Sequence, residues 1–152
     1  MKLIKRSEGN WHYALNQTEF DLLGHLMKKF PHTRRALAKI SRTDSDPKSV
    51  EREELLNESL VEHRKELKRQ AVNLIAGNKL KISKQRHLLT WTAEDREILL
   101  QILNDIRVES WRALGEPENL ELEQLDGSAQ ELKYRSLMNL AGYFEHHVLG
   151  SK

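Results

Sequence analysis

The sequence predicts a mainly α-helical protein: a bundle of five or six helices around one central buried helix, with a small N-terminal β-hairpin. The 152 residues are 32% charged and only 6% aromatic, a composition typical of long solvated helices. In several segments apolar residues recur every three or four positions, and residues that cap helices precede these segments. We expect one helical domain over residues 1–152, with loops near residues 42–46, 77–90 and 115–128.

The central helix is expected at about residues 93–114. Thr92 is a suitable N-cap, and Asp95 stands at the third helical position. Gly115 and Pro117 follow the last turn and end the helix. Its apolar side chains cover an arc of roughly 220°, whereas a surface helix needs an apolar stripe of only about 100°, so we expect cover on more than one side. The arc contains Ile98, Leu99, Leu100, Ile102, Leu103, Ile106, Trp111, Ala113 and Leu114.

The N-terminal residues predict a β-hairpin followed by a helix. The two arms of the hairpin flank a turn at residues 7–10, where Gly9 can adopt a positive φ. Asn16 and Glu19 form the signature of a helix start, and helical apolar spacing continues until Pro31. The apolar residues of the hairpin are Leu3, Ile4, Trp11, Tyr13 and Leu15, and those of the helix are Phe20, Leu23, Leu26, Met27 and Phe30.

The middle of the chain predicts a short helix at residues 33–40, a loop at 42–46 and a long helical segment at 47–76. Pro47 suits the first turn of that segment, with Asp46 as its cap, and Gly77 ends it. A break near residues 57–59 stays open, because Ser59 could cap a new helix. The apolar set of the segment is Leu55, Leu56, Leu60, Leu67, Ala71, Leu74 and Ile75.

The rest of the chain predicts a basic connector at residues 79–91, the central helix, an acidic loop at 116–127 and a closing helix. Ser128 and Glu131 form a second capping box at the start of the closing helix. We expect the apolar stripe of this helix to pack on the central helix. The stripe contains Tyr134, Leu137, Met138, Ala141, Phe144 and Val148. No internal repeat of fixed period is evident in the sequence.

Composition excludes several classes of protein. The chain has no cysteine, which excludes disulfides, thiolate zinc sites and cysteine nucleophiles. No apolar run approaches the ~18 residues that a transmembrane helix needs. The apolar patch at the start of the chain is too short for a signal peptide. We therefore expect a cytoplasmic protein without a membrane partner, and the net charge of +2 indicates no particular partner.

The central helix contains the run Leu103-Asn104-Asp105-Ile106-Arg107 and closes at Leu114-Gly115. With the Gly9 hairpin and the final helix, this run resembles an uncharacterised bacterial family, a domain of unknown function that is well represented in actinobacteria. Two segments depart from the family pattern, because residues 79–86 are more basic than expected and the acidic loop is individual. The family has no established activity. Its actinobacterial members are often encoded beside the adaptor of a Clp-type protease, so the resemblance implies at most a link to regulated proteolysis.

Asn104, Arg107 and Trp111 share one edge of the apolar arc and are the candidate polar cluster. In one interpretation the Arg107 guanidinium binds a carboxylate or phosphate of a ligand, and Asn104 orients it. In the other, Arg107 is structural: it bonds a carboxylate of another helix and lies over Trp111. Asp105 faces the polar side of the helix, where we expect a lysine or arginine partner.

The sequence offers no catalytic residues and predicts no metal and no cofactor. Of the seven histidines, only His25, with Asp21, has the spacing that lets two ligands project together from one helix. The motifs of serine nucleophiles, phosphate loops and helical metal sites are missing from the sequence. These absences favour a non-enzymatic protein, although an enzyme stays an open alternative.

Residues 64–86 contain eight lysines or arginines and one acid, which raises nucleic-acid binding as an alternative function. No helix-turn-helix geometry is evident there, so this alternative is not favoured. The leading hypothesis is a cytosolic helical module that binds another protein, with a homodimer as one form. A small-anion or enzymatic site at Arg107 is the third hypothesis. The candidate nucleic-acid contacts are Lys68, Arg69, Lys79, Lys81, Lys84 and Arg86.

Overall fold

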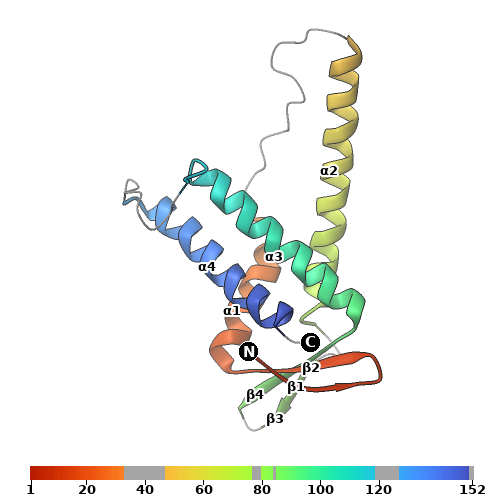
Figure 1. Cartoon of the computed structure of the whole chain (residues 1–152), viewed down its shortest axis with the longest axis vertical. Helices are drawn as coiled ribbons and strands as arrows, with labels where there is room; N and C mark the ends of the chain where they lie inside the picture. Colours follow the sequence, from red (N-terminus) through yellow and green to blue (C-terminus); the bar gives the residue numbers. More distant parts are fainter. Residues whose placement is uncertain (33–46, 77–79, 84, 119–126, 151–152) are drawn as a thin grey trace.

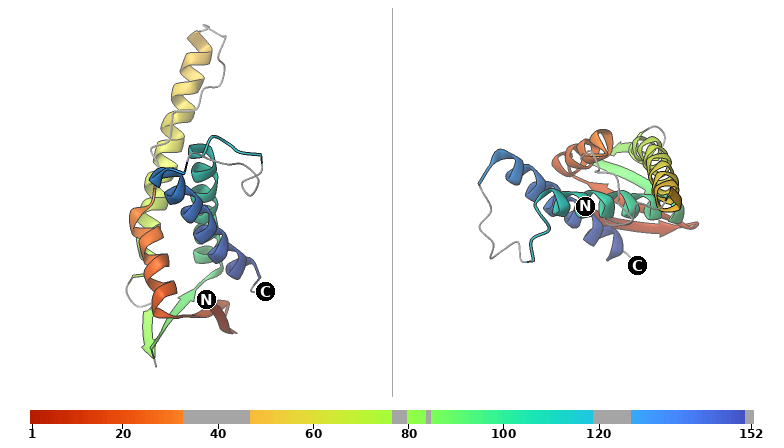
Figure 2. Two further views of the ribbon diagram at one scale, coloured as in Figure 1. Left: turned by 90° about the vertical axis from the view of Figure 1, so that its left-hand side faces the viewer. Right: turned by 90° about the horizontal axis from the view of Figure 1, so that it is seen from above.

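The computed structural model describes residues 1–32, 47–76, 80–83, 85–118 and 127–150 of the chain, with the backbone alone for residues 80–83. These residues form four helices and a four-stranded sheet, which lies at one end of the molecule with the helices rising from it (Figures 1 and 2). The elements are β1 (Lys2–Ser7), β2 (Asn10–Leu15), α1 (Gln17–Lys29), α2 (Pro47–Asn73), β3 (Leu80–Ser83), β4 (Arg86–Trp91), α3 (Ala93–Ala113) and α4 (Ala129–Leu149). The protein is mainly helical as predicted, but the described residues form four helices rather than five or six.

Two β-hairpins build the sheet, and their second strands pair with each other. The strand order is β1-β2-β4-β3, and each neighbouring pair is antiparallel. The basic connector predicted at residues 79–91 is wrong, because this segment contains the hairpin of β3 and β4. His87, Leu89 and Trp91 are buried at every second position of β4, while Arg86 is exposed. Burial at every second residue is characteristic of a strand. The sequence analysis did not recognise this pattern because basic residues are interspersed among the apolar ones.

The N-terminal hairpin has the predicted turn. Glu8 has a φ of 53° and Gly9 a φ of 77°. Two consecutive positive φ values in a two-residue loop are characteristic of a type I′ turn, whose twist matches that of the two strands. The apolar face of β2 is buried as predicted, and Ala14 on the opposite face is buried as well. This deep burial agrees with the position of β2 between β1 and β4, inside the sheet.

Both hairpins lead directly into helices through complete capping boxes, and both predicted helix starts are confirmed. At α1, the Asn16 side-chain oxygen accepts a hydrogen bond from the Glu19 N–H at 2.8 Å, and Glu19 accepts one from the Asn16 N–H at 2.9 Å. At α3, Thr92 and Asp95 exchange the same bonds at 3.1 and 3.0 Å. The reciprocal bonds satisfy backbone N–H groups that have no partner inside the helix.

Helix α3 is the buried central helix that its apolar arc predicted. α4 packs along one side of it, and the second half of α2 contacts another side (Figures 1 and 2). Leu99, Ile102 and Leu103 have no exposed surface, and Ile106 is 2% exposed. Towards the C-terminal end the enclosure loosens, because Trp111 is half-buried and Ala113 is exposed.

Helix α4 packs its predicted stripe on the core. Its buried residues are Tyr134, Leu137, Ala141, Phe144 and Val148, while Met138 is half-buried. Ser128 caps the helix by accepting a hydrogen bond from the Glu131 N–H at 3.1 Å. The Glu131 carboxylate accepts from the Gly127 N–H at 2.6 Å rather than completing the predicted capping box. Most of the acidic loop, residues 119–126, lies outside the described residues.

Helix α2 is one uninterrupted helix, and the break considered at residues 57–59 does not occur. Its second half reaches the core through Leu67 and Ala71, followed by Leu74 and Ile75 just after the helix. Its first half projects beyond the other helices (Figure 1). The short helix predicted at 33–40, the loop at 42–46 and the stop at Gly77 lie outside the described residues.

The order strand, strand, helix, helix occurs twice along the chain. β2 begins at residue 10 and β4 at residue 86, and the helix caps are residues 16 and 92, an offset of 76 in each case. The offset also relates the apolar positions of α1 to those of α3: residues 22, 23, 26, 27 and 30 correspond to 98, 99, 102, 103 and 106. The sequence shows no repeat of fixed period, and the recurrence found here is one of element order and residue class rather than of residue identity.

Candidate functional site

The predicted cluster of Asn104, Arg107 and Trp111 does not converge on one pocket. The Arg107 guanidinium donates to Glu145 of α4 at 2.7 Å, with Arg107 45% and Glu145 17% exposed. The Trp111 ring N–H donates to the Pro117 carbonyl at 3.0 Å, and Asn104 is exposed. The carboxylate partner belongs to another helix, as the structural interpretation of Arg107 requires. No ring contact between Arg107 and Trp111 is found among the described residues.

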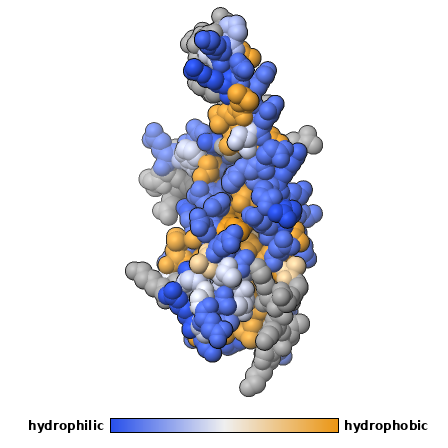
Figure 3. Space-filling model, turned by 90° about the vertical axis from the view of Figure 1, so that its right-hand side faces the viewer, coloured by the Kyte–Doolittle hydropathy of each residue, from blue (hydrophilic) through white to orange (hydrophobic). Residues whose placement is uncertain are grey.

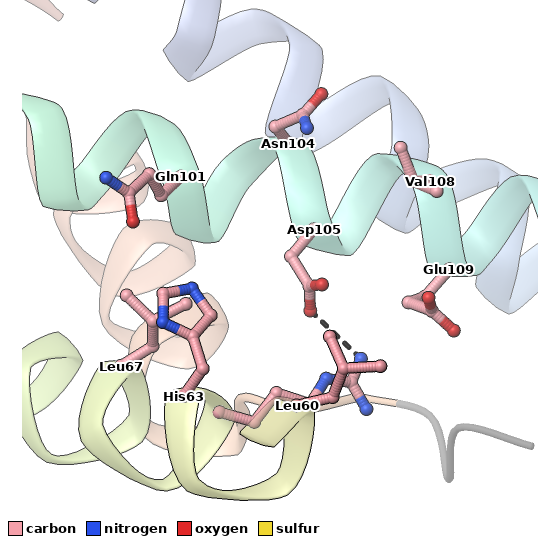
Figure 4. A pocket seen from close by; sticks show the side chains of 9 residues that line it. Leu60, His63, Leu67, Gln101, Asn104, Asp105, Val108 and Glu109 are labelled. Atoms are coloured by element: carbon pink, nitrogen blue, oxygen red, sulfur yellow. Dashed lines mark hydrogen bonds and ion pairs between the residues drawn. The ribbon is translucent and has the colours of Figure 1, made fainter. Parts of the chain in front are cut away.

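A groove of about 410 Å³ lies between α2 and α3 (Figure 4). Arg64 crosses it from α2 and donates to Asp105 of α3 at 2.9 Å, with side chains 13% and 21% exposed. This bond confirms that Asp105 pairs with a basic residue. The ion pair neutralises both charges, so the groove offers mixed apolar and polar contacts without a free carboxylate–guanidinium pair for a ligand. The lining residues are Leu60, His63, Arg64, Leu67, Gln101, Asn104, Asp105, Val108 and Glu109.

A second hollow, of about 420 Å³, lies where β2 meets α3 and the end of α4. The Trp11 ring lies between two guanidinium groups, with the Arg6 carbon 4.4 Å and the Arg96 carbon 4.3 Å from its centre. Arg96 also donates to the Tyr13 hydroxyl at 3.1 Å and to the Val148 carbonyl at 2.5 Å. The sequence analysis missed this cluster, because its members come from two strands and from two helices that are far from them in sequence. Arg96 joins the sheet to both helices, which is a structural role.

Two of the histidines, His87 and His32, fill structural positions. His87 is buried, stacks on Phe20 with ring centres 4.1 Å apart, and shares a hydrogen bond of 2.8 Å with Gln17. Burial lowers the pKa of His32, and its hydrogen bond with the Leu26 carbonyl opposes this only in part. No group of three or more histidines and acids that could hold a metal ion occurs in the described part of the chain.

Glu19 and Tyr143 join α1 to α4. The Tyr143 hydroxyl donates to Glu19 at 2.5 Å, and the Met1 amine also contacts this carboxylate. The hydrogen bond to Glu19 and burial raise the pKa of Tyr143 to about 12. Burial raises the pKa of Glu19, but the hydrogen bonds from the Met1 amine and Tyr143 outweigh it, so the pKa is lowered overall. The cluster is a polar link between helices.

The predicted basic surface is divided between two parts of the molecule. Lys68 and Arg69 are exposed on α2, but Arg69 already donates to Glu66 at 2.5 and 3.1 Å. Arg86 is exposed on β4. Lys81 lies in β3, and Lys79 and Lys84 lie outside the described residues.

Helix α2 has more large exposed apolar side chains than any other helix in the described structure. Large apolar side chains interrupt the hydrophilic surface along α2 (Figure 3). Half of the large apolar side chains that are exposed in the described residues lie on this one helix. They are Val50 (48% exposed), Leu55 (59%), Leu56 (41%), Val61 (43%) and Val72 (43%). Exposed apolar side chains gathered on one element are characteristic of protein contact sites.

Comparisons with known proteins found no matching family model, no matching curated protein and no matching solved structure. The resemblance to the actinobacterial family therefore stays a prediction. Within the described residues, no helix combines the length and the apolar character that crossing a membrane requires.

Proposed function

We propose that the protein is a non-catalytic interaction module whose helix α2 is the contact surface for another protein chain. The observation that carries the proposal is the exposure of Val50, Leu55, Leu56 and Val61 on the projecting half of α2. Of the 27 residues of this helix, only Leu67 and Ala71 are buried. Water-exposed apolar side chains in one region favour association, because contact with a partner removes them from water.

Two further observations support a binding role over catalysis. The charged groups of the groove between α2 and α3 have partners: Arg64 bonds Asp105 across the groove, and Glu109 bonds Arg112 outside it at 3.2 Å. A nucleophile with an adjacent base is not found among the groove residues. The basic residues proposed for nucleic acid are divided between α2 and the sheet, which does not favour one continuous phosphate-binding face. Arg107 is already paired with Glu145, which weakens the anion-site alternative.

The proposal is tested by cross-linking the full-length protein in a lysate of its source organism, with a reagent that joins lysines. Intermolecular links should concentrate on Lys48, Lys65 and Lys68 of α2, whereas Lys133 of α4 should carry few. A Clp-type adaptor is the first heterologous partner to add in purified form, as the family resemblance suggests.

The matched variants are Val61→Glu on α2, where Val61 is 43% exposed, and Leu132→Glu on α4, since Leu132 is 68% exposed and apolar too. Val61→Glu should remove most of the intermolecular links, and Leu132→Glu should leave them unchanged. Links that concentrate on α4 or the sheet, or an equal response of the two variants, would contradict the proposal.

A further inference from the structure

The outer face of α2 carries three valines at equal spacing. Val50, Val61 and Val72 are 11 residues apart, and 11 residues make about three helical turns, so the three side chains lie in one line along the helix. They are 48%, 43% and 43% exposed. Leu67, which holds α2 on the core, lies about a third of a turn away from this line. Among the described residues, the valine line therefore lies outside the face of α2 that packs on the core.

Charged residues of opposite sign separate the valines. Glu54 lies between Val50 and Val61, and Lys68 lies between Val61 and Val72. Both are exposed, and neither has an ion-pair partner among the described residues. The two halves of the helix differ in charge as a whole: residues 51–62 contain five glutamates and one arginine, and residues 63–73 contain four basic residues and one glutamate.

We propose that α2 pairs antiparallel with α2 of a second copy of this chain, with the two-fold axis at Val61. The inference rests on the proposed function and names its partner. In this register a residue of one copy lies opposite a residue of the second copy when their two numbers add to 122. Val61 then faces its own copy, Val50 faces Val72, and Glu54 faces Lys68, with each of the last two contacts formed twice by symmetry. Valine contacts alternate with the Glu54–Lys68 contacts along the pair, and each of these charged contacts joins opposite signs.

The charges select this orientation over the parallel one. A parallel pair would place Glu54 against Glu54 and Lys68 against Lys68, and like charges in contact disfavour association. In the antiparallel pair the projecting acidic half of each helix lies on the basic second half of its partner. That second half is accessible, because Lys68 and Val72 are exposed while α2 is packed on α3. Association therefore needs no rearrangement of either copy.

The first experiment places one cysteine at the two-fold axis. The chain has no cysteine of its own, so Val61→Cys introduces a single thiol that meets its own copy across the axis. Mild oxidation of the full-length variant should give a disulfide-linked dimer in high yield. Leu55→Cys is the matched control, since Leu55 is on the same helix and 59% exposed but points away from the valine line. Equal linking at the two positions would overturn the inference.

The second experiment tests register and direction with exchanged charges, by size-exclusion chromatography with light scattering. Glu54→Lys and Lys68→Glu each create two like-charge contacts, so each variant alone should dissociate at a concentration where the unchanged protein is dimeric. Mixed in equal amounts, the two variants should form a heterodimer, because all the exchanged positions then meet opposite charges. High salt should weaken this recovery. If the mixture of the two variants forms no heterodimer, the antiparallel register is wrong.

The outcomes separate this inference from the proposed function. A protein that stays monomeric at every accessible concentration, while its α2 lysines cross-link to a different protein, overturns the dimer and leaves the interaction module standing. A monomer whose α2 carries no intermolecular links overturns both. A dimer that is linked through Val61→Cys and recovers in the charge-exchange mixture supports both.

Discussion

The two halves of the chain begin alike and end differently. In each, a hairpin leads through a capping box into a helix with the same apolar spacing. In the second half, α4 then packs along α3. In the first half, α2 contacts both α1 and α3 with its second part, and its first part projects from the molecule (Figure 1).

The helices that follow the two capping boxes bury different apolar surfaces. α1 buries one stripe, formed by Leu23, Gly24, Leu26 and Met27. α3 has a broad apolar arc that accommodates α4 on one side and α2 on another. Similar local sequence signals therefore start both helices, and each of them contacts both α2 and α4, so the two halves differ in how the following helix is placed rather than in the number of neighbours. In the described structure the first part of α2 keeps its large apolar residues exposed.

The largest expected effect contrasts the packed α4 with the projecting part of α2. Phe144→Ala removes a side chain with no exposed surface and should lower the free energy of unfolding by about 3–5 kcal/mol. Leu56→Ala, at a side chain that is 41% exposed, should change it by less than about 0.5 kcal/mol. Urea unfolding of the two variants measures both values. A large loss for Leu56→Ala would mean that the first half of α2 is packed in the free protein.

A smaller effect concerns the ion pairs that join α3 to its two neighbours. Arg64 is 13% exposed and bonds Asp105, whereas Arg107 is 45% exposed and bonds Glu145. Arg64→Met leaves a largely buried carboxylate without its partner and should cost about 1–3 kcal/mol of stability. Arg107→Leu should cost no more than about 1 kcal/mol, since water screens an exposed pair. A loss of several kcal/mol for Arg107→Leu would show that this pair is essential to the fold.

The two capping boxes should respond equally, because they occupy equivalent positions in the two halves. Asn16→Ala and Thr92→Ala each remove the side-chain acceptor of one helix start, and each should cost about 1 kcal/mol. Thermal unfolding at neutral pH compares the two variants. Unequal losses of stability would show that the two capping boxes share their geometry but contribute differently to the free energy of unfolding.

The smallest effect is the pH response of the link between α1 and α4. The folded pKa of Glu19 is lowered from its ordinary value of 4.5, so its ionised form contributes stability that is present above pH 4.5 and is lost as the pH falls through the lowered folded value. Glu19→Gln should therefore lose less stability than the unchanged protein on acidification through this range. Denaturant titrations at several pH values measure the difference, and parallel losses would contradict the link.

The same link predicts a tyrosine whose pKa is raised. Tyr143 ionises only near pH 12, above its ordinary value of 10.0, because its hydroxyl donates to Glu19. Ultraviolet absorbance should show a tyrosine step near pH 12 that is absent from the Tyr143→Phe variant. If the step persists in that variant, the assignment to Tyr143 is wrong.

What the sequence alone determined is local. Asn16 with Glu19 and Thr92 with Asp95 predicted the starts of α1 and α3, because a capping box joins residues three positions apart. The apolar spacing of α3 and α4 predicted which faces are buried, because helical periodicity lies within one segment. The position of Arg107 on the helical wheel placed it at the edge of the arc but left its structural and ligand-binding roles open, and only the tertiary structure supplies its partner Glu145.

The tertiary structure decided what depends on distant residues. β4 is a strand because it pairs with β2, which places Tyr13 beside Leu89, and nothing near residue 89 predicts that partner. The groove between α2 and α3, the cluster around Trp11 and the exposed valine line of α2 all depend on which helix faces receive neighbours. Such contacts are selected by the packing of the whole chain, since the free energy of burial depends on every surface that is covered, whichever segment supplies it.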